Sequence, residues 1–452
     1  SNGGVVSDKA AAARPVTMLL SGPAAGVLGA THMAELAGFE DILTLDVGGT
    51  STDVSLTEKL VPNLTSHSLV ENYPVKTPML DIATIGTGGG SLAWVDDYGG
   101  LKVGPQSSGA DPGPICYGRG GRQRIETDRV EVLTGIWRNT TRGSPIALQV
   151  INKDYKLERL DDLQRPRPGH GDLTGAVKYL GSIRGILERA SARETAVRVA
   201  AGALAKQLLR QFDIYTIGFV AELGGVEIPP RPGTLEKQIQ WRDESIIYSL
   251  DPDKDDKIRE LIDKTGRQGD TLGGVLEVRV EGLPFGLGTH SQWDRKLDGR
   301  LAQAVMAVQA IKGVEIGLGF EASRRVGSQV HDPIVYDESK KLGSTLGYQR
   351  PTNNAGGLEA GMTNGQPLVI RAAKKPISTL RKALASVNME TKTPEEAEYE
   401  RSDVCAVSAA SVIIENVVAF EVAGALIDKF GGDSLQEMQA RWKLFLDMAR
   451  ER

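Results

Sequence analysis

The sequence has very few cysteines and no excess of positive over negative charge. Only Cys116 and Cys405 occur in 452 residues, in unrelated settings, which excludes a disulfide framework and a cysteine-rich zinc site. We therefore expect no metal site and a reducing compartment, the cytoplasm. The formal net charge of −5 gives no electrostatic reason to bind nucleic acid or an anionic membrane surface. An anionic small molecule would have to be held by a local group of arginines.

Long apolar runs are absent as well. The longest stretch, residues 404–422, is interrupted by Glu415, Asn416 and Glu421, so it predicts a buried helix and not a membrane span. The chain opens with Ser-Asn-Gly-Gly and shows neither an initiator methionine nor a signal peptide. We therefore expect a fragment or a processed product.

Glycine, in contrast, is abundant, and its 53 residues predict many tight turns or backbone-lined ligand sites. Hydrophobic periodicity and turn residues place the secondary structure. The first part alternates a helix with short strands, and the second part combines long helices with alternating strands, which predicts an α+β fold. The expected elements are helices at 21–37, 184–212, 297–308 and 404–422, strands at 42–46, 52–56, 91–95, 146–151 and 276–280, and a last helix with the capping box Ser434 and Glu437.

One glycine-rich octapeptide, Asp-Val-Gly-Gly-Thr-Ser-Thr-Asp at residues 46–53, has the chemistry of a phosphate loop. The Gly-Gly turn lets backbone N–H groups approach phosphate oxygens, Thr50 and Thr52 add donors, and Asp46 suits a magnesium-bound water. It is neither a Walker loop nor a dinucleotide fingerprint, because no Gly-Lys-Ser/Thr follows and the next element is a strand. A plain hairpin turn explains the octapeptide alone equally well.

The neighbouring motifs favour the phosphate loop. Leu-Ser-Gly-Pro-Ala-Ala-Gly-Val at 20–27, Thr-Ile-Gly-Thr-Gly-Gly-Gly-Ser at 84–91 and Gly-Ala-Asp-Pro-Gly-Pro at 109–114 flank it in order. Together they resemble the hydantoinase/oxoprolinase family, which implies a partial actin-like (ribonuclease H-like) ATPase fold over residues 1–116. Members hydrolyse ATP to open cyclic amides. An earlier Gly-Gly-Thr loop of that family has no counterpart before Asp46, so we expect this segment to be inert as an enzyme.

From Tyr117 onward, many long motifs resemble the chorismate synthase family. They are YGRGGR at 117–122, RPRPGH at 165–170, ERASARETA at 188–196, LGTH at 287–290, WDRKL at 293–297, KGVEIG at 312–317, TNNAGGLE at 352–359, KPISTL at 375–380 and ERSD at 400–403. The resemblance implies a β-α-β sandwich subunit over residues 117–452, in a homotetramer with reduced FMN. The implied reaction is the 1,4-elimination of phosphate from 5-enolpyruvylshikimate 3-phosphate, which gives chorismate.

The resemblance also implies the site residues. A substrate with one phosphate and two carboxylates needs guanidinium groups, and Arg119 and Arg193 are the candidates, with Arg122 weaker. Ala360 stands where the family has glycine, so its methyl group makes it a weaker cofactor contact. By family position, FMN contacts fall on Arg189, Ala190, Ser191, Gln309, Ala310, Ala360, Lys375, Pro376, Ile377, Ser378, Thr379 and Arg401.

Two residues are candidates for proton transfer. His170 lies in a Pro-Gly turn, and the resemblance places it beside the reduced flavin, where it governs protonation; a lone histidine is otherwise more often structural. Asp403 matches an aspartate near flavin N5 that acts in removing the substrate proton. A more ordinary role for Asp403 is to cap the helix that we expect to begin near Val404, and the two roles are compatible. We assign no chemical role to His290 or His331.

A segment of the family is missing before Tyr117. The family has a Gly-Glu-Ser-His-Gly segment whose histidine protonates the departing phosphate, and here Gly113 replaces a further arginine. We therefore expect a chorismate synthase with impaired activity. The alternatives are an ATP-dependent hydantoinase or 5-oxoprolinase, and a non-functional chimera, because both families carry Tyr-Gly-Arg-Gly-Gly at the junction. Whether FMN is reduced by a partner or by NADPH is left open.

Overall fold

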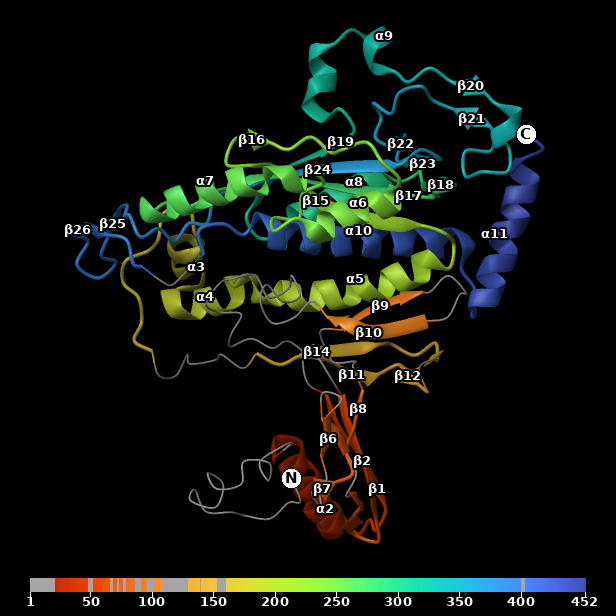
Figure 1. Ribbon diagram of the computed structural model, residues 1–452. Helices are drawn as coiled ribbons and strands as arrows, with labels where there is room; N and C mark the ends of the chain where they lie inside the picture. The colour runs from red at the N-terminus through yellow and green to blue at the C-terminus, as the bar shows by residue number, and fades with distance from the viewer. Residues whose placement is uncertain are drawn as a thin grey trace. The chain divides into compact units, whose positions relative to one another are not determined.

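The computed structural model describes residues 21–47, 52–65, 68–70, 73–75, 79–85, 91–95, 101–107, 129–138, 140–152, 160–399 and 403–452. The chain divides into two compact units, Ser1–Gln123 and Arg124–Arg452 (Figure 1). Each unit has its own secondary structure and its own buried side chains.

The first unit pairs a helix with a small antiparallel sheet. Helix α2 (Ser21–Ala37) ends at Gly38, whose φ is +80°, and strand β1 (Ile42–Val47) pairs with β2 (Thr52–Glu58). The predicted helix and both strands are confirmed, whereas the turn at 48–51 lies outside the described residues. The other strands are β3 (Val61–Pro62), β4 (Leu64–Thr65), β5 (Ser68–Val70), β6 (Tyr73–Val75), β7 (Met79–Leu80), β8 (Ala83–Ile85), β9 (Ser91–Val95) and β10 (Leu101–Ser107).

The second unit is built on an antiparallel sheet of five strands in the order β16-β15-β17-β24-β19. Leu276, Val278 and Val280 alternate along β17 and are fully buried, as the sequence pattern predicts for a half-buried strand. One face of the sheet therefore forms the floor of the core. The strands are β15 (Tyr215–Leu223), β16 (Val226–Glu227), β17 (Gly274–Glu281), β19 (Ile311–Ile316) and β24 (Leu368–Lys374).

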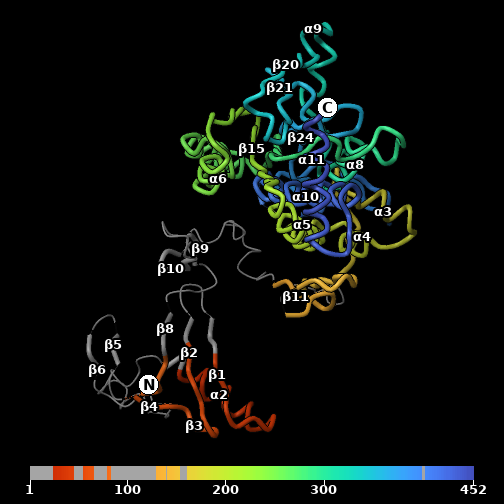
Figure 2. Tube along the Cα trace, turned by 90° about the vertical axis from the view of Figure 1, so that its right-hand side faces the viewer, coloured from red at the N-terminus to blue at the C-terminus, as the bar shows by residue number. Residues whose placement is uncertain are grey.

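Two long helices cover this floor. Helix α10 (Val407–Phe430) packs on β15 and β17, and α5 (Thr195–Arg210) lies along α10 on the side away from the sheet (Figures 1 and 2). The two helices approach closely at Gly202, where a side chain would collide with the backbone of Asn416. Strand β14 (Ala147–Val150) contacts α5 in turn. Sheet, helices and strand follow one another as the layers of an α+β sandwich.

Helix α10 contains most of the stretch for which the sequence predicts a buried helix and not a membrane span. It is long and apolar enough to cross a bilayer by length and composition. In the second unit, however, Ile414, Val418 and Val422 of α10 are fully buried against the sheet and the neighbouring helices. The predicted buried helix is therefore confirmed, although it begins at Val407 and not near Val404.

One predicted helix is wrong in its extent. Residues 184–212 do not form one helix. The helix is interrupted at Ser191, whose φ and ψ angles of −61° and 136° are extended. Helix α4 (Ile183–Ala190) ends there, and the 3-10 turn η4 (Ala192–Glu194) leads into α5. The Ser191 hydroxyl accepts a hydrogen bond from the Arg193 N–H at 3.3 Å, so a local side-chain cap replaces the helical bond.

Shorter elements surround this core. Helix α8 (Leu297–Met306) contacts α10 and β19, and the capping box of Ser434 and Glu437 opens α11 (Leu435–Ala449) as predicted. The remaining elements are β11 (Val130–Thr134), β12 (Ile136–Trp137), β13 (Thr140–Thr141), α3 (Asp172–Tyr179), α6 (Leu235–Glu244), η5 (Pro252–Lys254), α7 (Asp255–Arg267), β18 (Phe285–Gly288), η6 (Trp293–Arg295), η7 (Gly319–Arg324), α9 (Gly327–Val330), β20 (Val335–Tyr336), η8 (Glu338–Lys340), β21 (Tyr348–Gln349), β22 (Leu358–Glu359), β23 (Met362–Asn364), β25 (Ala385–Val387) and β26 (Pro394–Glu396).

Candidate functional site

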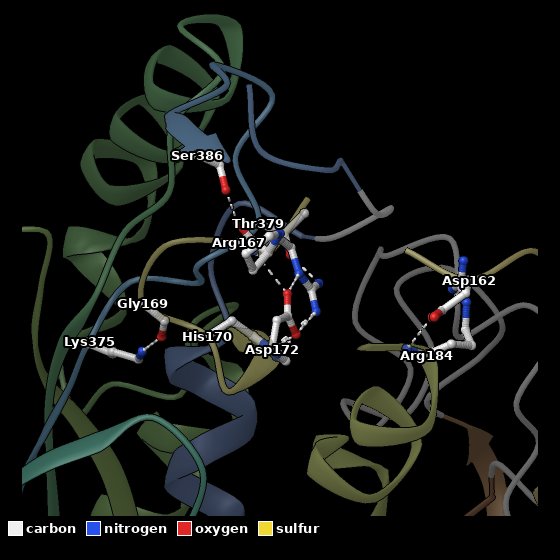
Figure 3. Close-up of polar contacts among 10 residues, drawn as sticks. Asp162, Arg167, Gly169, His170, Asp172, Arg184, Lys375, Thr379 and Ser386 are labelled. Carbon is white, nitrogen blue, oxygen red and sulfur yellow. Dashed lines mark hydrogen bonds and ion pairs between the residues drawn. The ribbon is translucent and has the colours of Figure 1, made fainter. Parts of the chain in front are cut away.

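The Pro-Gly turn before α3 holds His170 against a buried ion pair. His170 Nδ1 lies 2.5 Å from Asp172 Oδ1, and Arg167 donates to the same carboxylate from Nε at 2.8 Å and from its backbone N–H at 3.0 Å (Figure 3). Asp172 is fully buried and Arg167 is 6% exposed. Burial alone would raise the pKa of Asp172, but the hydrogen bonds from His170 and Arg167 hold it far below its usual range. The carboxylate is therefore ionised.

Arg167 connects this turn to the loop after β24. Its Nη1 donates to Thr379 Oγ1 at 2.9 Å, and Lys375 Nζ donates to the Gly169 carbonyl (Figure 3). Thr271 Oγ1 holds the same loop from the other side by donating to the Ile377 carbonyl at 2.7 Å. The structure thus places the predicted Lys375–Thr379 segment directly beside the turn that carries His170.

A second set of contacts adds the predicted residues near α4 and β19. The Lys375 N–H donates to the Ala310 carbonyl at 2.9 Å, and Gln309 Nε2 donates to Glu194 Oε1 at 2.5 Å. Glu194 follows the break at Ser191, so the segment with Arg189, Ala190, Ser191 and Arg193 is fixed to Gln309 and Ala310. Burial opposes it, yet the hydrogen bonds from Gln309 and Arg198 lower the pKa of Glu194.

Asp403 lies next to this group and does not cap a helix. It lines a small pocket together with Thr379, Thr271, Arg381 and other residues. Helix α10 begins three residues later than expected, with Ala406 as its N-cap and no side-chain cap bond, so the predicted capping role of Asp403 is wrong. The side chain is exposed, which keeps it accessible from the pocket that Thr379 also lines.

For three predicted residues the described part of the structure gives no contact with this group. Arg119 and Arg401 lie outside the described residues. Ala360 is exposed in the turn between β22 and β23, where its φ of +50° is a left-handed conformation that favours glycine. A side chain at the adjacent Gly361 would meet Lys296, which starts α8, so this turn is anchored at a different part of the unit.

The residues present fit an anionic cofactor with a polar ring such as FMN. Lys375 begins the loop after β24, and burial, followed by the charge of Lys312 on β19, lowers its pKa. The hydroxyl groups of Ser378 and Thr379 belong to the same loop, and ammonium and hydroxyl donors are what a phosphate group requires. Among the described residues, Gln309 Oε1 is buried without a hydrogen-bond partner, so it has a free acceptor position for a bound ligand.

Sequence reasoning missed three residues that organise the site. Arg167 and Asp172 fix His170, and Glu194 fixes Gln309, yet none of them was predicted. The only local signal for Asp172 was an acidic residue two positions after the histidine, at the start of a helix where a carboxylate is favoured. Arg167 and Glu194 each also have a distant partner, Thr379 and Gln309, at 212 and 115 residues in the sequence, which no local pattern encodes.

Comparison with known proteins decides the family. The family described as chorismate synthase matches residues 114–427. The chorismate synthase of Geobacter sulfurreducens is 49% identical over 367 residues, which cover 78% of this chain and 93% of that protein. This chain belongs to the chorismate synthase family. The chorismate synthase of Trichlorobacter lovleyi is 54% identical over 337 residues, which cover 72% of this chain and 86% of that protein.

A solved structure and a second family match complete the comparison. A crystal structure of a chorismate synthase superimposes with a TM-score of 0.60 at 33% identity, and the match covers 91% of this chain and 98% of that one. The family described as hydantoinase/oxoprolinase matches residues 1–145. The two family matches overlap over residues 114–145, which include the Tyr-Gly-Arg-Gly-Gly sequence at 117–121. The chain is therefore a fusion of a hydantoinase/oxoprolinase-like segment with a chorismate synthase.

Proposed function

We propose that this chain catalyses the 1,4-elimination of phosphate from 5-enolpyruvylshikimate 3-phosphate, giving chorismate, at the site around His170. The observation that carries the proposal is a continuous path of hydrogen bonds through the predicted cofactor segments. It runs from Glu194 to Gln309, from Ala310 to Lys375, and from Lys375 to Gly169. The segments that carry the predicted cofactor residues are far apart in the sequence but lie side by side around His170, as a single flavin site requires.

The charged side chains suit the substrate. It carries one phosphate and two carboxylates, and planar guanidinium groups bind both kinds of anion through paired hydrogen bonds. Arg193 lies in η4, next to Ser191 and Glu194, and we assign it to the substrate together with Arg119. The protein is acidic overall, with a net charge of −5, so these local cations supply the attraction.

The reaction removes one proton and one phosphate from the substrate. When bound, FMN in its reduced state would supply the electron-rich flavin ring that the elimination requires. Lys375, Ser378 and Thr379 would hold its phosphate, and Gln309 Oε1 would accept a hydrogen bond from it. We assign proton exchange beside the ring to His170, and removal of the substrate proton to Asp403, which lines the pocket shared with Thr379.

The residues before Tyr117 set the expected rate. No Gly-Glu-Ser-His-Gly segment occurs in the printed sequence, and Gly113 stands in place of an arginine. A positioned general acid contributes about a hundredfold to ten-thousandfold to a rate, so turnover should be lower than in a chorismate synthase with that segment by roughly this factor.

The test uses the full chain, anaerobically, with chemically reduced FMN and 5-enolpyruvylshikimate 3-phosphate. We expect chorismate and inorganic phosphate to appear in equal amounts, and reduced FMN to bind. The matched comparison is a second fusion in which a Gly-Glu-Ser-His-Gly segment from a chorismate synthase precedes Tyr117. Failure of both proteins to bind reduced FMN would refute the proposal, and ATP-dependent hydrolysis of 5-oxoproline would favour the hydantoinase-like alternative instead.

Two finer expectations accompany the proposal. We propose that the chain assembles into a homotetramer, which light scattering coupled to gel filtration measures directly. We also propose that NADPH reduces bound FMN. Adding NADPH to the oxidised FMN complex without oxygen tests this, because reduction bleaches the flavin absorbance, and an unchanged spectrum would show that the reductant comes from elsewhere.

A further inference from the structure

The contact between His170 and Asp172 favours one tautomer of the neutral imidazole ring. Asp172 Oδ1 lies 2.5 Å from His170 Nδ1, a distance at which a hydrogen must lie between the two atoms. Asp172 has no proton to give, because it is fully buried among donors from Arg167 that stabilise its charge. The hydrogen therefore belongs to Nδ1 of the imidazole, and the neutral ring carries its lone pair on Nε2.

Arg167 is the next polar neighbour of the ring, and as a donor it does not itself select the Nδ1–H tautomer. Arg167 Nη2 lies 3.1 Å from Nδ1 and 3.5 Å from Nε2, along the edge of the ring, and it also donates to Asp172 Oδ1 at 3.1 Å. A guanidinium has no acceptor, so it cannot compete with Asp172 for the Nδ1 hydrogen. Lys375, the other nearby cation, is turned to the Gly169 carbonyl.

We infer that Asp172 is a positioning residue that holds His170 as the Nδ1–H tautomer and presents Nε2 for proton exchange. Arg167 holds Asp172 in place through its Nε and backbone N–H, and its Nη1 ties the pair to Thr379 in the predicted cofactor loop. Buried carboxylates that orient a histidine in this way select one tautomer and one ring orientation. The inference deepens the proposed function, since the proton that His170 exchanges would pass through Nε2.

The primary experiment needs no substitution. The full chain is prepared with 15N-labelled histidine, and the couplings between ring nitrogens and ring protons identify which nitrogen of neutral His170 is protonated. A His170→Gln variant assigns the signal among the five histidines. We expect the Nδ1–H tautomer. A neutral ring protonated on Nε2 would overturn the inference, whether or not the chain turns over substrate.

Variants then test the part played by Asp172. In Asp172→Asn the amide can donate as well as accept, so the Nδ1–H tautomer should lose its dominance, and kcat should fall about tenfold to hundredfold with KM little changed. Asp172→Glu keeps a carboxylate and should restore much of the tautomer signal. If Asp172→Asn folds and keeps the wild-type tautomer, Asp172 does not position the ring and the inference fails.

Asp255→Asn is the matched control. Asp255 is also a buried carboxylate, and it accepts hydrogen bonds from Ser245 Oγ at 2.8 Å and from the Ile246 N–H at 2.6 Å, between α6 and α7. Its substitution should leave the His170 tautomer and kcat unchanged. If Asp255→Asn lowers kcat as much as Asp172→Asn does, the loss at 172 is a general effect on the fold.

Discussion

Gln309 donates a hydrogen bond from Nε2 to Glu194 Oε1 at 2.5 Å, and this contact joins the end of α8 to the start of α5. Glu194 also accepts from Arg198 Nε at 3.0 Å, one turn further along α5. The same glutamine carries a buried Oε1 for which no hydrogen-bond partner occurs among the described residues. One side chain thus braces two segments with one end and offers an acceptor with the other.

Gln309→Leu should weaken the binding of reduced FMN. The substitution removes both the hydrogen bond to Glu194 and the buried acceptor, and a lost hydrogen bond of this kind costs about 1–3 kcal/mol, or roughly fivefold to 150-fold in affinity. An anaerobic titration followed by flavin absorbance measures the dissociation constant. Gln303→Leu, on the exposed side of α8, serves as the control. Equal affinities of the wild type and Gln309→Leu would remove Gln309 from the cofactor site.

Lys375→Met should weaken binding of FMN but not of riboflavin. If the ammonium group of Lys375 binds the cofactor phosphate, its removal costs about 2 kcal/mol, or roughly thirtyfold, for a charge-assisted hydrogen bond. Riboflavin has no phosphate, so its affinity should change much less. Lys340→Met changes an exposed lysine on η8 and should affect neither ligand. A parallel loss of affinity for both flavins would show that Lys375 acts through the fold, by its contact with Gly169.

Local patterns in the sequence predicted the secondary structure well where one side of an element is buried. The alternation of Leu276, Val278 and Val280 and the apolar composition of α10 both follow from packing against one core. The break at Ser191 was missed because apolar residues keep a helical spacing on both sides of it. A serine side chain that caps its own neighbour competes with the helix without changing that spacing.

The site was predictable only through family resemblance. Side-chain chemistry alone favoured a structural role for His170 over a catalytic one, since a single histidine does not reveal its partners. The two partners of His170, Arg167 and Asp172, are close in the sequence, but the position of this group beside the cofactor loop depends on tertiary contacts such as the one between Arg167 and Thr379, which lie 212 residues apart. The capping role expected for Asp403 was wrong because the helix begins further on, at Val407. The ends of helices and strands depend on tertiary contacts more than the existence of these elements does.

Ala360→Gly should stabilise the protein. Ala360 has a φ of +50°, a conformation that costs an L-residue about 1 kcal/mol relative to glycine. Removing the methyl group relieves that strain, so the free energy of unfolding in urea should rise by about 1 kcal/mol. Ala203→Gly, at an exposed position within α5, should have the opposite sign, because glycine destabilises a helix by about 1 kcal/mol. A decrease in stability for Ala360→Gly would mean that the methyl group makes contacts worth more than the strain.

Asp172→Ala should destabilise the second unit strongly, and by an amount that depends on pH. It leaves Arg167 buried without its carboxylate, which typically costs about 3–5 kcal/mol. The pKa of Asp172 is lowered in the folded state by His170 and Arg167, against the effect of burial, so its ionised form stabilises the protein above its ordinary value of 3.8. As the pH falls below that value, the unfolded state takes up the proton first and this advantage shrinks. The free energy of unfolding in urea should therefore differ strongly between wild type and variant at neutral pH, and less near pH 3. A difference that grows on acidification would contradict an ionised Asp172.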